Sequence, residues 1–307
     1  MNILIVSAFF APEITPRAFR TVELVKELLK RKISVTLCIP YRKIEDLDLK
    51  NEEYLKIIYL TDSPLLPKLP RGKDIFSRAL RYLFSFFVHL FQYPYIKLCY
   101  KIPKQLASID VKYDLLISIA APHAVHWGVE RLLKENKNIC KYWVADCGDP
   151  FMGDSVHKHP FYFKYLEKSF CDSVDFISVP IEEAKNAYYQ QYLNKIHVIP
   201  QGFDIESFKS LKFLYRKNEI PIFAYAGALY PGYRDLNDLI DYLMTLDLKF
   251  IFVLYTPMGH LVSSYKRKLG DKLVVRTLLP REVLLKELSK MDFLVNIENR
   301  NVVQLPS

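Results

Sequence analysis

The alternation of short apolar runs with amphipathic helical patterns constrains the fold of this chain more than any other feature. Apolar, β-branched runs occur at 2–8, 33–39, 55–60, 113–119, 141–145, 175–179 and 196–199. Helical patterns occur between most of them, at 16–32, 74–92, 123–136, 159–171 and 181–191. Such alternation is typical of a parallel, doubly wound sheet with helices on both faces. The sequence therefore predicts an α/β fold.

The alternation pauses once and then begins again. After Pro200 a polar stretch runs to about Glu219, and a second series starts at Pro221, with strands at 222–227, 249–254, 272–276 and 292–296 and helices at 234–245, 258–268 and 281–290. We predict two tandem Rossmann-like lobes, residues 1–203 and 204–307. Doubly wound sheets bind ligands beyond the carboxyl ends of their strands, so we expect a site in the cleft between the lobes.

The cysteines and the apolar runs indicate the compartment. Five cysteines, an odd number without close pairs, favour a reducing environment over a disulfide framework. Met1 leads directly into the first predicted strand, without the basic region or cleavage site of a secretion signal. The longest apolar run, 82–91, has about half the length that a membrane-spanning helix needs. We expect a cytoplasmic protein without a transmembrane helix.

The positive charge is concentrated in one aromatic segment. Of a net charge of +9, most comes from residues 71–104, where seven lysines and arginines stand against the single acidic residue Asp74. Two interpretations stay open: a helix whose aromatic side chains form core under a sheet, or peripheral contact with anionic lipid at the inner face of the membrane. We expect no nucleic-acid partner.

Charged side chains follow the predicted strands of the first lobe. Arg17 and Arg20 lie at the start of the helix after the first strand, where backbone N–H groups and guanidinium groups suit a phosphate. A solvated helix start is the alternative. Asp146 and Asp149 follow the fifth strand and suit hydrogen bonds from substrate hydroxyls, unless Asp149 only caps the turn before Pro150.

Four segments, in this order, resemble glycosyltransferases of the GT-B fold, most closely the retaining family 4. They are 2–20, 117–126, 144–151 and 198–204, the last reading Val-Ile-Pro-Gln-Gly-Phe-Asp. The resemblance implies a GT-B type fold in which the first lobe holds the acceptor and the second holds the nucleotide-sugar. It further implies no metal and no cofactor other than the nucleotide-sugar co-substrate.

The resemblance also assigns roles to individual residues. His123 is implied to face the acceptor and the transferred sugar, where a histidine can bind a hydroxyl or assist proton movement; His126 competes for this role. Asp149 is the second catalytic candidate. The candidates for binding the donor are Arg17, Arg20, Gly227, Arg234 and Glu298.

Two other ligand sites are excluded by spacing. Cys140, Cys147, His157 and His159 fit no usual zinc pattern, so we expect no metal. The glycines 227 and 232 imitate a phosphate-binding P-loop, but Tyr233 stands at its essential lysine position.

The sequence therefore predicts a retaining glycosyltransferase that moves a sugar from a nucleotide-sugar donor to a glycan or lipid-linked acceptor, as in polysaccharide biosynthesis. The last residues resemble the start of a later donor-lobe helix, so we expect an incomplete second lobe and leave the activity of this chain open. A non-catalytic, acceptor-binding remnant of such an enzyme is the alternative. A nucleotide-sugar epimerase of similar build is disfavoured, because the four segments resemble those of transferases.

Overall fold

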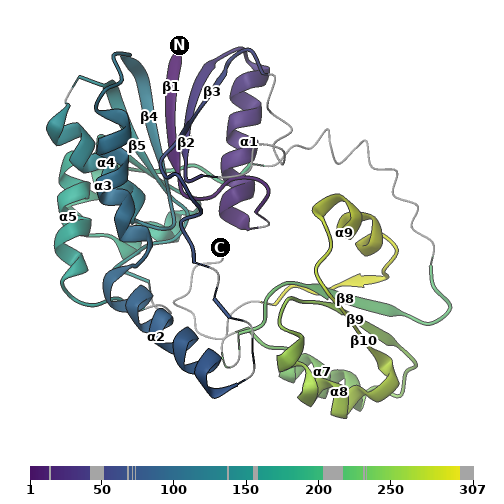
Figure 1. The fold of residues 1–307 in the computed structure, drawn as a ribbon. Helices are drawn as coiled ribbons and strands as arrows, with labels where there is room; N and C mark the ends of the chain where they lie inside the picture. The colour runs from purple at the N-terminus through teal and green to yellow at the C-terminus, as the bar shows by residue number, and fades with distance from the viewer. Residues whose placement is uncertain are drawn as a thin grey trace. The chain divides into compact units, whose positions relative to one another are not determined.

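The computed structural model describes residues 1–13, 15–41, 52–67, 69–70, 72, 74–136, 138–154, 158–202, 217–230, 232 and 234–297. The chain divides into two compact units, Met1–Phe203 and Asp204–Pro306 (Figure 1).

The first unit contains a seven-stranded parallel sheet of order β3-β2-β1-β4-β5-β6-β7. Its strands are β1 (Asn2–Ser7), β2 (Ser34–Ile39), β3 (Leu55–Tyr59), β4 (Tyr113–Ala120), β5 (Cys140–Cys147), β6 (Phe176–Val179) and β7 (Ile196–Val198). These strands are continuous apolar runs because both faces of the sheet are covered; Ile3 to Val6 are all buried. The strand order reverses between β1 and β4, which is where doubly wound sheets bind ligands.

Helices cover both faces of this sheet. The covering helices are α1 (Pro16–Lys30), α3 (Leu98–Leu106), α4 (Ala124–Glu135) and α5 (Phe163–Ser173), whereas α2 (Ile75–Phe91) extends beyond them (Figure 1). Figure 1 shows α1 on one face and α3, α4 and α5 on the other. Thr15 caps α1 by accepting a hydrogen bond from the Ala18 N–H at 3.2 Å, and Pro16 fits the first helical turn.

Two elements differ from the sequence prediction. The predicted helix 181–191 is wrong, because two 3₁₀ helices, Glu182–Ala187 and Gln190–Lys195, occupy the region. Tyr188 interrupts them with extended backbone, and its side chain is buried. The helix α3 was not predicted, since Pro103 within it is a residue that normally ends helices.

The helix α2 resolves one of the alternatives for the basic, aromatic segment. Ser77 is its one buried residue, and the side chains of Phe76, Tyr82 and Phe86 are exposed. The interpretation that its aromatic side chains form core under a sheet is therefore wrong. Among the described residues, no helix is both long enough and apolar enough to cross a membrane.

The second unit contains a four-stranded parallel sheet of order β10-β9-β8-β11. Its strands are β8 (Ile222–Ala226), β9 (Ile251–Tyr255), β10 (Leu273–Arg276) and β11 (Phe293–Leu294), and its helices are α7 (Asn237–Thr245), α8 (Ser263–Leu269) and α9 (Arg281–Leu288). Ile240 and Tyr265 pack on one side of the sheet and Leu284 on the other. The predicted α/β fold with two Rossmann-like units is confirmed.

Candidate functional site

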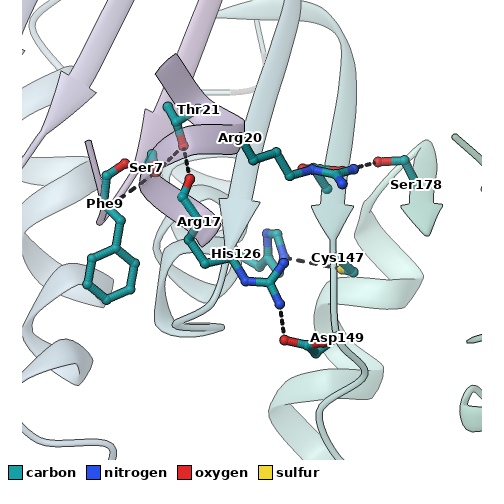
Figure 2. Close-up of polar contacts among 10 residues, drawn as sticks. Ser7, Phe9, Arg17, Arg20, Thr21, His126, Cys147, Asp149 and Ser178 are labelled. Atoms are coloured by element: carbon teal, nitrogen blue, oxygen red, sulfur yellow. Dashed lines mark hydrogen bonds and ion pairs between the residues drawn. The ribbon is translucent and has the colours of Figure 1, made fainter. Parts of the chain in front are cut away.

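The carboxyl ends of β1, β4 and β5 bring distant parts of the sequence together. Ser7 of β1 is in register with Ile119 of β4, and Ala120 of β4 with Cys147 of β5. The arginines of α1 follow β1, the histidines at the start of α4 follow β4, Asp146 lies near the end of β5 and Asp149 just after it. Figure 2 shows Arg17, Arg20, His126 and Asp149 at this edge. Parallel pairing therefore gathers the predicted site residues of the first unit at one edge of the sheet.

Arg20 forms a buried, bidentate ion pair with Asp146. Its Nε lies 2.5 Å from Oδ2 of Asp146 and its Nη2 lies 2.5 Å from Oδ1. The Ser178 hydroxyl donates to the same Oδ1 at 2.6 Å, and the Arg20 and Asp146 side chains are 11% and 9% exposed. This arrangement ties α1 to β5 and β6. Only Nη1 of Arg20 is left, buried and without a hydrogen-bond partner in the described structure.

Arg17 pairs with Asp149 nearer the surface. The Arg17 side chain is 15% exposed and that of Asp149 is 40% exposed. Burial and the nearby Arg20 lower the pKa of Arg17, so a further anion beside this guanidinium would be favoured. The exposed carboxylate of Asp149 can accept a hydrogen bond from a hydroxyl, and the guanidinium of Arg17 can pair with a phosphate.

Gly148 is a site residue that the sequence reasoning missed. A Cβ atom at this position would lie 1.6 Å from Nη1 of Arg17, so only glycine leaves room for the guanidinium against the backbone. Its place between the two carboxylates Asp146 and Asp149 was the available signal.

His126 is held in a closed chain of hydrogen bonds. The indole N–H of Trp143, which can only donate, contacts the Ser118 hydroxyl at 2.7 Å, and this hydroxyl contacts Nδ1 of His126 at 2.8 Å. If Ser118 donates to Nδ1, the ring proton of His126 lies on Nε2, 3.3 Å from the Cys147 sulfur. Burial lowers the pKa of His126 to about 3. Both ring nitrogens are therefore occupied and the ring is neutral.

His123 differs from His126 in this respect. Its ring stacks on Phe151 at a centroid distance of 4.7 Å, and its Nε2 has no hydrogen-bond partner among the residues the structure describes. Burial, the two neighbouring histidines and Arg17 lower its pKa well below 6.5, so the ring is neutral. The unmet nitrogen favours His123 over His126 for binding a ligand.

The same histidines lie beside a cysteine at distances that suggest a metal site. Nitrogen and sulfur atoms of His123, His126 and Cys147 all lie within 4.8 Å of one another. However, the hydrogen bonds of His126 use both of its nitrogens, and burial raises the pKa of the Cys147 thiol to about 12. The thiol would have to lose its proton before it could bind a metal, and in this structure the group forms a hydrogen-bonded part of the core. Of the residues weighed for zinc, His157 lies outside the described residues.

In the second unit, Gly227 and Arg234 lie beyond the carboxyl end of β8. The Gly227 N–H donates to the Tyr255 carbonyl at 2.9 Å, which continues the sheet by one residue. Tyr230 and Arg234 then exchange backbone hydrogen bonds of 2.7 Å, so the chain turns back here and the helix begins at Asn237 rather than 234.

The Arg234 side chain has an unused donor in this loop. Its positive charge acts on the pKa of Tyr225, so the two groups are near each other, and its Nε is buried with no hydrogen-bond partner in the described part of the chain. A Cβ atom on Gly227 would lie 2.9 Å from the Tyr225 hydroxyl, which donates to the Ala228 carbonyl at 2.8 Å. The glycine thus keeps this turn tight. Glu298, the remaining predicted donor-binding residue, lies outside the described residues.

Comparison with known proteins identifies the fold. No family model and no curated protein matches the chain. Solved structures match both units. A glycosyltransferase from Rickettsia africae matches with a TM-score of 0.61 and 13% identity, over 95% of this chain and 72% of its own. HepE from Anabaena in complex with UDP also gives 0.61, with 12% identity over 96% and 73%. The catalytic domain of starch synthase IV from Arabidopsis thaliana, bound to ADP and acarbose, gives 0.60, with 12% identity over 96% and 77%.

The chain has the GT-B fold. Within this GT-B fold, the structure brings four predicted residues of the first unit into one cluster: Arg17, Arg20, His123 and Asp149. It places Gly227 and Arg234 in one loop of the second unit.

Proposed function

We propose that this protein is a glycosyltransferase that moves a sugar from a nucleotide-sugar donor to a glycan or lipid-linked acceptor. The observation that carries the proposal is the GT-B fold, matched over both units by glycosyltransferase structures that include one with UDP and one with ADP and acarbose. The charged groups at the carboxyl edges of both sheets supply chemistry suited to such substrates. We further propose that anomeric configuration is retained and that no metal takes part.

The donor-binding role falls to the loop after β8. Gly227 permits close approach of the backbone to a diphosphate, and the unused Nε of Arg234 supplies a donor and a positive charge. Negative charge accumulates on the diphosphate as the glycosidic bond breaks. A cation held in place before the reaction stabilises that charge without reorganisation, and the transition state gains from it.

The acceptor role falls to the edge of the first sheet. The neutral His123 offers Nε2 to a sugar hydroxyl, and the exposed carboxylate of Asp149 accepts a hydrogen bond from another. Arg17 stands behind Asp149 and fixes its position, and we propose that it also meets negative charge of the donor. Arg20 acts indirectly, because its charge is already balanced by Asp146.

Donor binding tests the proposal most directly. Calorimetry with a panel of UDP-, ADP- and GDP-sugars should show binding to the full chain, and Arg234→Gln should weaken it by about tenfold or more, as expected for a lost charged hydrogen bond. Lys266→Gln, which removes an exposed charge from α8 of the same unit, is the matched control.

Product analysis then tests the transfer step. Sugar transfer to a glycan or lipid-linked acceptor is followed by chromatography, and proton NMR of the anomeric centre reports retention or inversion. If no nucleotide-sugar binds while both units stay folded, the transferase proposal fails. The acceptor-binding remnant would then be the better description.

A further inference from the structure

The outer face of α2 is a continuous apolar stripe. Phe76, Leu80, Leu83, Phe87 and Phe91 follow one another at spacings of three or four residues, so they share one side of the helix. Their exposed fractions are 76%, 37%, 50%, 41% and 50%. We call these five residues the α2 stripe. Contiguous exposed apolar surface of this kind marks an interaction site.

Polar contacts hold α2 to the rest of the first unit. Arg81 donates to the carbonyls of Pro70 at 2.8 Å and Gly72 at 2.9 Å, and the Tyr162 hydroxyl donates to the Leu90 carbonyl. Ser77 is the one buried residue of the helix. No other helix or strand of the described first unit packs along α2, and Figure 1 shows it extending beyond α3 and α4. The stripe is therefore fixed in an outward position without a partner in its own unit.

The charge around the stripe selects the kind of partner. Residues 75–109 contain five lysines and arginines and no aspartate or glutamate. Arg78 lies on the side of the helix away from the stripe, whereas Lys97 and Lys104 are exposed in the segment that follows α2. Tyr82 and Tyr100, 77% and 62% exposed, add the amphipathic rings common at lipid headgroups. A second copy of the chain would bring the same positive charge, which opposes self-association through this face.

We propose that α2 and residues 92–104 dock on an anionic phospholipid surface. The 17 residues of α2 form a helix of about 25 Å, which lies in the plane of the membrane with the α2 stripe at the boundary of headgroups and acyl chains. Lys97 and Lys104 meet lipid phosphates. This docking goes beyond sugar transfer, and a chain without transferase activity would still show it.

Vesicle flotation with the full chain tests the docking. Vesicles of phosphatidylcholine mixed with phosphatidylglycerol should carry the protein upward, and vesicles of phosphatidylcholine alone should carry much less. The triple variant Phe76→Ser, Leu83→Ser, Phe87→Ser should bind the mixed vesicles at least about tenfold more weakly. Each replacement loses the free energy that an apolar side chain gains when it leaves water. Lys97→Gln should weaken binding about fivefold, and added salt should weaken it too.

A matched control removes exposed apolar residues elsewhere. Tyr242, Met244 and Leu248 of the second unit are 61%, 46% and 58% exposed, and their replacement by serine should leave vesicle binding unchanged. Circular dichroism verifies that both triple variants are folded.

Three results would overturn the proposal. They are absence of binding to the mixed vesicles, equal binding to neutral vesicles, and equal losses in the two triple variants. Light scattering without lipid tests whether a second copy of the chain binds this face instead. A dimer that is lost in the triple variant of the stripe would assign the face to self-association.

Discussion

Breaking the ion pair of Arg20 and Asp146 should strongly lower the free energy of unfolding of the first unit. Asp146→Asn keeps the shape of the side chain and an acceptor for the Ser178 hydroxyl, but removes the negative charge. Arg20, 11% exposed, is then left as an uncompensated cation beside β5. Removing one partner of a buried pair costs about 3–5 kcal/mol in free energy of unfolding.

A double variant distinguishes the effect of the unpaired buried charge from a general loss of contacts. Arg20→Met combined with Asp146→Leu removes both charges and fills the space with apolar atoms, so the double variant should be more stable than Asp146→Asn alone. Asp149→Asn is the exposed counterpart. Its carboxylate is 40% exposed, against 9% for Asp146, so its loss should cost less free energy of unfolding than the loss of Asp146.

Urea unfolding followed by tryptophan fluorescence is a suitable assay. The chain has two tryptophans, Trp127 and Trp143, and both are buried in the first unit, so the signal reports that unit alone. A loss below about 1 kcal/mol in Asp146→Asn, or a double variant no more stable than it, would refute the idea that buried charge dominates here.

Three further predictions concern the same edge of the sheet. Gly148→Ala should displace the Arg17 guanidinium and lower transfer activity at least about tenfold, whereas Gly202→Ala, with nothing within 4 Å, should not; equal activities would contradict the packing argument. His123→Ala should lower kcat by about 10²-fold with little change in donor affinity, as steady-state kinetics would show. The free energy of unfolding should fall with acid, because His126 binds a proton below a pKa of 6.5 in the unfolded chain but only near 3 in the folded one. The contribution of His126 is complete above pH 6.5 and about 2 kcal/mol smaller at pH 5. Urea unfolding at several pH values, compared with His126→Gln, measures it.

The fold was largely predictable because buried parallel strands have a plain sequence signature. Each strand of the first sheet lies within two residues of an apolar run, since both faces of such a sheet exclude water. The helix α3 escaped prediction because Pro103 argues against a helix, although its neighbours Ile102 and Leu106 are buried against the unit. Local propensity was overridden there by packing.

The site was predictable in its residue types and its location. Polar residues that follow parallel strands must gather at one edge, so Arg17, His123 and Asp149 were expected near one another. Their pairing was not predictable. Arg20 meets Asp146, over a hundred positions away, because β1 and β5 flank β4 in the sheet, and sequence spacing carries no record of that order.

The sequence by itself determined the strands, the two-unit α/β organisation and the edge where charged groups gather, since these follow from periodicity and from the direction of parallel strands. Tertiary structure alone decided which histidine keeps an unmet nitrogen, because the hydrogen bonds of His126 come from Ser118 on β4 and Cys147 on β5. It also decided that the aromatic side of α2 faces outward. A helical pattern shows which residues share a face, but only the packing of the whole unit shows what that face meets.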